Sequence, residues 1–336
     1  MEQISGVSTA YRVTGNGPVR VLLIHALTGG TDAADRDGVK GWWGPVFKQG
    51  APFDETSATV WTPNLLGSCY GTTWNAYDAV SAAWNACDAV SAAWNAYDAV
   101  SAACPDQTEP LPAINTRLQA EALAHWILSL DLRFDLLIGP SLGGMVGLEL
   151  AYMLPDRFRA IGIIGCAARS DAWLWGTNEI QRAILQCPEL SDEKAIALAR
   201  RAAMLTFRTP LSLGERFKTP EKMRDWLAYH GMALAARFTR KSYIAMLDAM
   251  DSHDLGRGRG GLISAMSGIK RPLFMLAMQG DRLVSDDSLY ETIDSAKQAG
   301  VPVVLDWIQT THGHDSFLIE WPQVMDWLNK LISEIS

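Results

Sequence analysis

Short and almost continuously apolar runs recur along this chain, separated by longer stretches with helical periodicity. The runs rich in valine, isoleucine and leucine lie at residues 19–26, 58–63, 135–138, 160–167, 272–278 and 301–308. Between them, residues 115–130, 142–154 and 321–335 carry apolar side chains at helical spacing. Strands that are apolar on both faces and alternate with helices are typical of a parallel sheet covered on both sides. The sequence therefore predicts an α/β fold with a mostly parallel sheet.

Composition and charge narrow the class of protein further. The chain has 336 residues, 48% of them apolar, and a formal net charge of -8, which argues against a nucleic-acid partner. No signal-peptide pattern opens it, and no apolar run reaches the roughly 20 residues of a membrane helix. The five cysteines, Cys69, Cys87, Cys104, Cys166 and Cys187, form neither a CxxC pair nor a metal-ligand spacing. We expect a cytoplasmic protein with reduced thiols, no metal site and no membrane partner.

The strand pattern stops between residues 170 and 267. Helical periodicity there predicts helices over residues 178–186, 192–207, 220–238 and 241–250. A helical block inserted between core strands is expected to cover the carboxyl ends of the sheet as a lid that excludes water, or else to be additional structural mass. The predicted organisation is a core of residues 1–169 and 268–336 with a helical lid of residues 170–267.

A tandem repeat occupies residues 74–103. The ten-residue unit WNAYDAVSAA occurs three times, with one tyrosine replaced by Cys87 in the second copy. Ten residues are not a whole number of helical turns, so the tryptophans would drift around a helix by about 80° per copy. The repeat is interpreted as a duplicated insertion in a surface connection, with an exposed aromatic patch for a partner as the alternative.

The motif GPSLG at residues 139–143 follows one apolar run and precedes a predicted helix. A GxSxG sequence at a strand-to-helix turn is the nucleophile elbow of the α/β-hydrolase fold, which exposes the serine hydroxyl at the edge of the sheet. Ser141 is therefore the candidate nucleophile.

The acid and base of this fold follow the serine in that order, at the ends of later strands. Asp281 follows the run at 272–278 and His314 follows the run at 301–308, whereas His312 is an alternative base. Asp286 and Asp287 are alternative acids, although their place at a helix start suits caps better.

The loop after the first long strand, HALTGG at residues 25–30, is expected to provide an oxyanion-hole amide. Leu27 is the predicted donor on that loop, and Leu142, which follows the nucleophile, is the second. His25 is interpreted as a structural hydrogen-bonding residue.

Five segments resemble the homoserine O-acetyltransferases: HALTGG at residue 25, NLLGSCYGTT at 64, GPSLGGM at 139, SYIAMLDAMDSHDLGRGRGG at 242 and GHDSFLIE at 313. This resemblance favours His314 as the base. It implies an α/β-hydrolase-fold enzyme of methionine biosynthesis, in which Ser141 takes an acetyl group from acetyl-CoA and homoserine removes it. The co-substrate acetyl-CoA is the only cofactor implied.

The resemblance also implies a substrate clamp. Arg200 matches the family arginine expected to hold the substrate carboxylate, and Asp315 matches the acid expected to hold the ammonium group. Phe207 departs from the family pattern, which has a tyrosine there. Family members commonly dimerise through the lid, so a homodimer is implied here as well.

Three rival functions remain at this point. A carboxylic ester hydrolase would use the same triad with water as acceptor, and a sister acyltransferase would use succinyl-CoA or L-serine. A non-enzymatic scaffold that binds through the repeat would not need Ser141, Asp281 and His314 in fold order.

Overall fold

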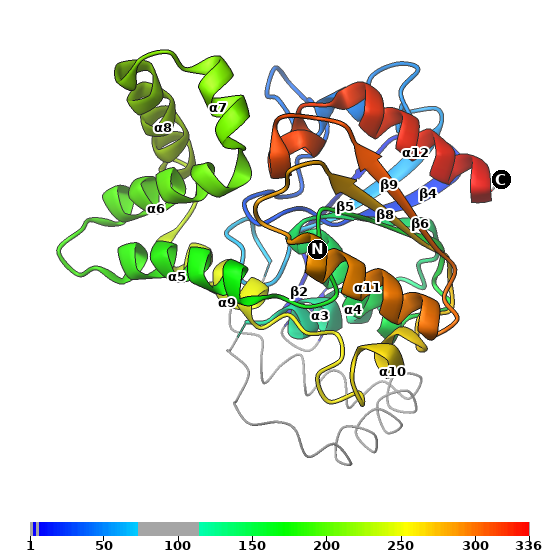
Figure 1. Ribbon diagram of the computed structural model, residues 1–336. Coiled ribbons are helices and arrows are strands. Elements are labelled where there is room, and N and C mark those ends of the chain that lie inside the picture. Colours follow the sequence, from blue (N-terminus) through cyan, green and yellow to red (C-terminus); the bar gives the residue numbers. More distant parts are fainter. Residues whose placement is uncertain (1–2, 5–6, 73–113, 336) are drawn as a thin grey trace.

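The computed structural model describes residues 3–4, 7–72 and 114–335 of the chain (Figure 1). Within these residues a seven-stranded sheet has the order β3–β5–β4–β6–β7–β8–β9. Only β3 runs antiparallel to its neighbour, and all other neighbouring strands are parallel. The strands are β3 (Tyr11–Thr14), β4 (Val19–Leu23), β5 (Ala58–Pro63), β6 (Phe134–Pro140), β7 (Phe158–Ile164), β8 (Leu273–Met278) and β9 (Val303–Ile308). The predicted α/β class is confirmed. Strands β1 (Gln3–Ile4) and β2 (Val7–Ser8) form a separate antiparallel pair.

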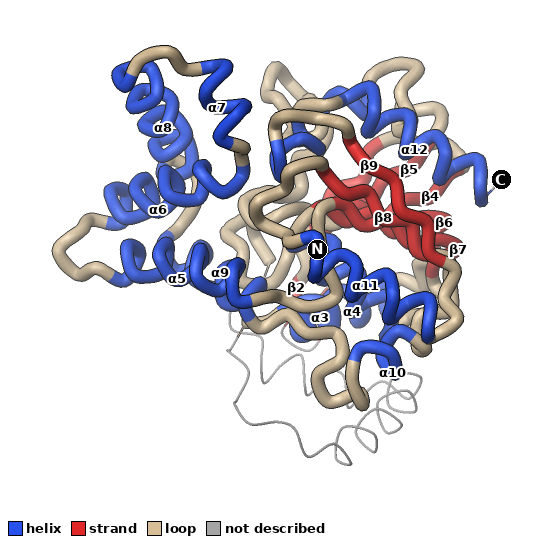
Figure 2. The backbone as a smooth tube through the Cα atoms, viewed as in Figure 1, coloured by secondary structure: helices blue, strands red, loops and turns tan. Residues whose placement is uncertain are grey.

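Helices cover both faces of the sheet, as Figures 1 and 2 show. Helices α3 (Thr116–Ser129), α4 (Leu142–Met153) and α11 (Asp286–Gln298) pack on one face, and α12 (Trp321–Ile335) with the short helix η1 (Gly44–Phe47) packs on the other. Side chains alternate between the two faces of a strand, so Leu22 joins the first core while Val21 and Leu23 join the second. This two-sided burial explains why the strands read as continuous apolar runs.

The segment from residue 170 to residue 267 contains helices and none of the sheet strands among the described residues. They are α5 (Ala172–Gln186), α6 (Asp192–Phe207), α7 (Pro210–Arg216), α8 (Pro220–Ala235), α9 (Arg240–Asp251) and α10 (Leu262–Met266). We call this segment the helical insertion. Helices α5, α6, α7 and α8 stand to the left of the sheet in Figure 1, and α6 packs between α5 and α8.

Side-chain caps fix where these helices begin. Asp171, Ser191, Thr209, Thr219 and Thr239 each accept a hydrogen bond from the backbone N–H three residues later. Such a bond satisfies one of the amides that a helix start leaves without an intrahelical partner.

Several element boundaries differ from the prediction. Helix α5 begins at Ala172 rather than Asn178, because Asp171 caps it, and α8 ends at Ala235 rather than Phe238. Strand β3 and the short helices α7 and α10 were not predicted. The tandem repeat at residues 74–103, with Cys87, lies outside the described residues, as does Cys104. In the described part of the chain no helix is long and apolar enough to cross a membrane.

Candidate active site

Ser141 lies at the turn where β6 ends and α4 begins. Its backbone has φ 52° and ψ −125°, which is a strained conformation for a residue with a side chain. The turn is also tight, since a Cβ atom on Gly139 would lie 2.3 Å from the carbonyl oxygen of Gly143. A Cβ atom on Gly143 would lie 2.2 Å from the carbonyl oxygen of Ile24. Glycine is therefore required on both sides of the serine.

Three side chains meet beyond the carboxyl ends of the parallel strands. His314 Nε2 lies 3.0 Å from Ser141 Oγ, and His314 Nδ1 lies 2.8 Å from Asp281 Oδ2. Asp281 follows β8, and its other oxygen accepts the backbone N–H groups of Leu283 and Val284. With the imidazole proton on Nδ1, facing the carboxylate, Nε2 is free to accept the serine proton. This arrangement can activate Ser141 as a nucleophile.

The protonation of His314 is set by opposing effects. Burial lowers the pKa of this histidine, whereas the charge of Asp281, its hydrogen bond and the charge of Asp315 raise it. The net result is a pKa above the ordinary value of 6.5. A raised pKa makes the imidazole a better proton acceptor and stabilises the imidazolium that forms when serine loses its proton.

The alternative base and acids lie elsewhere. His312 Nδ1 accepts hydrogen bonds from Arg208 and from Ser212 of the helical insertion, 3.1 Å and 2.8 Å away. Asp286 and Asp287 lie in the first turn of α11, as predicted, but the cap of that helix is Ser285. The expectation that one of these aspartates caps the helix was wrong. The serine at the preceding position has the extended backbone of an N-cap and accepts the N–H of Ser288.

The loop after β4 lies against the same site. Leu27 lines the pocket beside Ser141, and Leu142 is the first residue of α4, where helix amides point towards incoming negative charge. His25 is fully buried, with Nδ1 2.8 Å from the carbonyl oxygen of Ala26 and Nε2 accepting the N–H of Leu65. Burial is the main cause that lowers the pKa of His25 to about 4. This neutral ring holds the loop in place, as expected for a structural residue.

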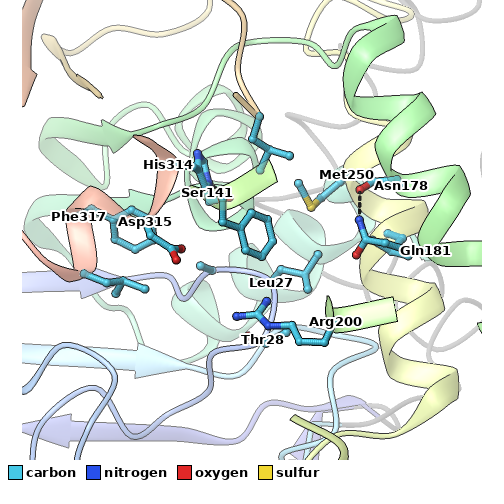
Figure 3. Close-up of a pocket in the computed structure, with 15 residues that line it drawn as sticks. Leu27, Thr28, Ser141, Asn178, Gln181, Arg200, Met250, His314, Asp315 and Phe317 are labelled. Atoms are coloured by element: carbon cyan, nitrogen blue, oxygen red, sulfur yellow. Dashed lines mark hydrogen bonds between the residues drawn. The ribbon is translucent and has the colours of Figure 1, made fainter. Parts of the chain in front are cut away.

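A pocket opens above Ser141 between the core and the helical insertion (Figure 3). The core and the insertion both contribute to its lining, which consists of Ala26, Leu27, Thr28, Ser141, Asn178, Gln181, Arg200, Phe207, Leu247, Met250, Leu283, His314, Asp315, Phe317 and Leu318. The site therefore needs residues that lie far apart in the sequence.

Arg200 and Asp315 bring opposite charges to this pocket. Arg200 comes from α6, and its guanidinium carbon lies 5.0 Å from the centre of the Phe207 ring. Asp315 belongs to the short helix η2 (Gly313–Leu318), next to His314. Burial raises the pKa of Asp315, and the positive charge of Arg200 opposes that rise most strongly. Both side chains line the same pocket, so it offers one positive and one negative group to a ligand.

Asn178, Gln181, Leu247 and Met250 line the pocket without having been predicted. They lie on α5 and α9, and only the tertiary packing of these helices determines which of their faces lines the pocket. Leu247 and Met250 belong to the apolar residues of a predicted helix, whereas Asn178 and Gln181 are polar, so helical periodicity could not identify the four as pocket residues. No group of histidine, cysteine or acidic side chains among the described residues is arranged to hold a metal ion.

Comparison with known proteins gives one consistent family. Residues 19–318 match the α/β hydrolase fold family. The chain is 30% identical to a homoserine O-acetyltransferase of Chloroherpeton thalassium, over 96% of this chain and 82% of that protein. It is 32% identical to a homoserine O-acetyltransferase of Nostoc punctiforme, over 98% of this chain and 90% of that protein.

Solved structures share the fold at lower identity. A homoserine O-acetyltransferase from Staphylococcus aureus superimposes with a TM-score of 0.75 at 22% identity, over 98% of this chain and 89% of that one. Esterase E22 gives a TM-score of 0.76 at 16% identity, over 98% of this chain and 95% of that one. Acyltransferases and esterases thus share this architecture, and the choice between them depends on the pocket.

Proposed function

We propose that this chain, which belongs to the homoserine O-acetyltransferase family of the α/β-hydrolase fold, transfers an acetyl group from acetyl-CoA to the side-chain hydroxyl of L-homoserine. Membership of that family makes the protein an acyltransferase. The observation that carries the finer proposal is the pocket, where a serine–histidine–aspartate chain lies beside one cation and one anion. A simple esterase has no need for that pair of charges.

The first half of the reaction loads the enzyme. Ser141 Oγ attacks the thioester carbonyl while His314 takes the serine proton, and the negative oxygen is held by the backbone amides of Leu27 and Leu142. The carbon–sulfur bond then breaks, and His314 returns the proton to the CoA sulfur. Asp281 keeps the imidazole in the correct tautomer throughout. The product is acetyl-Ser141 and free CoA.

The second half unloads it. Arg200 binds the carboxylate of homoserine and Asp315 binds its ammonium group, which places the side-chain hydroxyl near the acyl carbon. His314 takes the hydroxyl proton, the new ester bond forms, and Ser141 leaves with the proton returned by His314. Apart from the CoA thioester no cofactor is required. We also place this reaction in methionine biosynthesis in the cytoplasm, with residues 170–267 acting as the lid over the core.

The test is thiol release from acetyl-CoA with L-homoserine, with L-serine or with no acceptor. Release that depends on homoserine supports the proposal, and dependence on serine or a preference for succinyl-CoA would make the protein a sister acyltransferase. Release without an acceptor would make it a hydrolase on the same triad.

Ser141→Ala should abolish thiol release and leave the thermal midpoint within a few degrees of the wild type, because Oγ contributes chemistry and little packing. Turnover retained by a folded Ser141→Ala protein would rule out the covalent route.

Arg200→Ala should raise the KM for homoserine at least tenfold and leave the KM for acetyl-CoA unchanged, since a lost charge-assisted hydrogen bond is worth roughly 1.5–3 kcal/mol. Unchanged acceptor kinetics would remove Arg200 from the clamp.

A further inference from the structure

Phe207 is the last residue of α6, and its side chain lines the pocket. The centre of its ring lies 6.0 Å from the centre of the His314 imidazole, with the two planes inclined by 35°. The guanidinium carbon of Arg200 lies 5.0 Å from the same phenyl ring. Arg200 and Phe207 are seven residues apart, which is about two helical turns, so they share one face of α6. The phenyl ring therefore borders both the base and the cation of the pocket (Figure 3).

Two hydrogen bonds hold the end of α6 against the loop that carries the catalytic histidine. Arg208 Nη2 donates to His312 Nδ1 at 3.1 Å, and the hydroxyl of Thr209 donates to the carbonyl oxygen of Thr311. The half-buried ring of Phe207 also packs against the apolar core of the sheet. The position of the ring beside the imidazole is therefore fixed from both directions along the chain.

The space that this ring fills would otherwise suit a water molecule. An ordered water needs roughly 2–4 polar partners, and a cavity without them stays dry. Arg200 would offer N–H donors at this place, and His314 would offer Nε2 as an acceptor once Ser141 is acetylated. In the free enzyme that nitrogen is paired with Ser141 Oγ, but the oxygen of an ester has no proton to donate. Without the ring, water would have partners beside the base.

Such a water would compete with the acceptor for the acetyl group. His314 would take a proton from the water, and the water oxygen would form a bond to the acyl carbon. The ester bond to Ser141 would then break, His314 would return the proton to Oγ, and acetic acid would leave. A second ring, that of Phe317, lies 5.9 Å from the imidazole, so apolar side chains from both the core and the helical insertion border the base.

We propose that Phe207 is a specificity-determining residue: its ring excludes water from the space beside His314, so that acetyl-Ser141 passes its acetyl group to an amino acid instead of being hydrolysed. The inference rests on the proposed acyl transfer and adds the residue that suppresses the side reaction. A ring that only supported Arg200 would change the binding of the acceptor and not the choice between acceptor and water.

The experiment measures the ratio of acetate to O-acetylhomoserine formed from acetyl-CoA, at L-homoserine concentrations up to saturation. This ratio reports the fate of acetyl-Ser141 whichever step limits turnover. Phe207→Ala should raise the ratio at saturating homoserine about tenfold, because a hydrated cavity replaces the ring. Phe207→Tyr, which keeps the ring, should stay within about twofold of the wild type, and Phe207→Leu, which fills part of the space, should give an intermediate ratio.

Phe217 provides the matched control. It follows α7 in the helical insertion, its ring lies 5.3 Å from the guanidinium carbon of Arg216, and it does not belong to the pocket lining. Phe217→Ala removes the same ring from a similar setting and should leave the product ratio unchanged. Thermal midpoints show which variants are folded, and Phe207→Leu replaces Phe207→Ala as the test if the alanine variant does not fold.

The outcomes distinguish this inference from the proposed function. An unchanged product ratio in the folded Phe207 variants, with or without a higher KM for homoserine, overturns the role in excluding water and leaves the acyltransferase intact. An equal rise in Phe217→Ala overturns it as well. A wild-type protein that forms acetate alone with every amino acid offered overturns the proposed function and this inference together.

Discussion

At the scale of single residues, Ser141 differs from the other serines at helix starts. Ser191 and Ser285 accept a backbone N–H of the helix they precede. Ser141 holds the same N-cap position on α4, makes no such bond, and has its hydroxyl 3.0 Å from His314. A strained backbone, which costs on the order of 1–3 kcal/mol, keeps the hydroxyl available for chemistry.

The raised pKa of His314 predicts a pH profile. The base must be neutral, so kcat/KM should fall as the pH drops through a midpoint above 6.5. Asp281→Asn removes the charge that raises this pKa and leaves burial, which lowers it, so the midpoint should move to lower pH. The same variant should lower kcat roughly 10³–10⁴-fold, because the imidazole loses its preferred tautomer.

The measurement is kcat/KM for p-nitrophenyl acetate between pH 5 and 9, with Asp286→Asn as the matched control on the first turn of α11. A profile that shifts equally in both variants would contradict the role given to Asp281.

The sequence could predict the position of Ser141 because the elbow motif depends on local backbone geometry. It could not by itself choose between His312 and His314, which lie two residues apart in one loop. What separates them is the surroundings: one ring meets Arg208 and Ser212, and the other meets Asp281 and Ser141. Arg208 and Ser212 belong to the helical insertion, and Asp281 and Ser141 follow strands β8 and β6. The positions of these elements next to the two histidines cannot be derived from the periodicity of the sequence.

At the scale of elements, helical periodicity located most of the long helices to within three residues, but it placed the start of α5 six residues too late. Strand β3 escaped prediction because it is a four-residue edge strand whose side chains are partly exposed, so it lacks the apolar run of its neighbours. Helices α7 and α10 are too short for a periodic pattern. Short elements depend on the tertiary contacts around them.

One contact joins the helical insertion to the loop after β4. Arg237, which follows α8, donates hydrogen bonds to the carbonyl oxygen of Thr28 and to the hydroxyl of Tyr70, both at 2.6 Å. Thr28 follows Leu27, the proposed oxyanion donor. Arg237→Met should therefore lower kcat/KM for acetyl-CoA about fivefold to tenfold, because the loop is held less firmly.

Arg237 is exposed, so its replacement should change the thermal midpoint by only a degree or two. Arg224→Met, which removes another exposed arginine from the helical insertion, is the matched control. Equal kcat/KM values for the two variants would contradict the link between this contact and the oxyanion loop.

At the scale of the whole molecule, the helical insertion carries exposed apolar side chains. Leu198 and Leu205 lie two turns apart on α6, and Tyr229 and Met232 lie one turn apart on α8. Apolar residues grouped on one surface favour association. We expect a homodimer through the helical insertion.

Light scattering on the purified protein checks this expectation. Leu205→Glu should shift the measured mass towards the 36.8 kDa of the monomer. Val39→Glu, which changes an exposed residue outside the helical insertion, should leave the mass unchanged. A wild-type protein that is monomeric at every concentration measured would rule out the dimer.

The contacts at the end of α6 have a consequence for recombining members of this family. Arg208 and Thr209 of the helical insertion bond to His312 and to the carbonyl oxygen of Thr311, in the loop that carries His314. A chimera that receives residues 170–267 alone would lose these contacts between the insertion and the loop. The catalytic histidine of the recipient protein would then be misaligned. The insertion should therefore be exchanged together with residues 311–313, although 43 residues of sequence lie between the two segments.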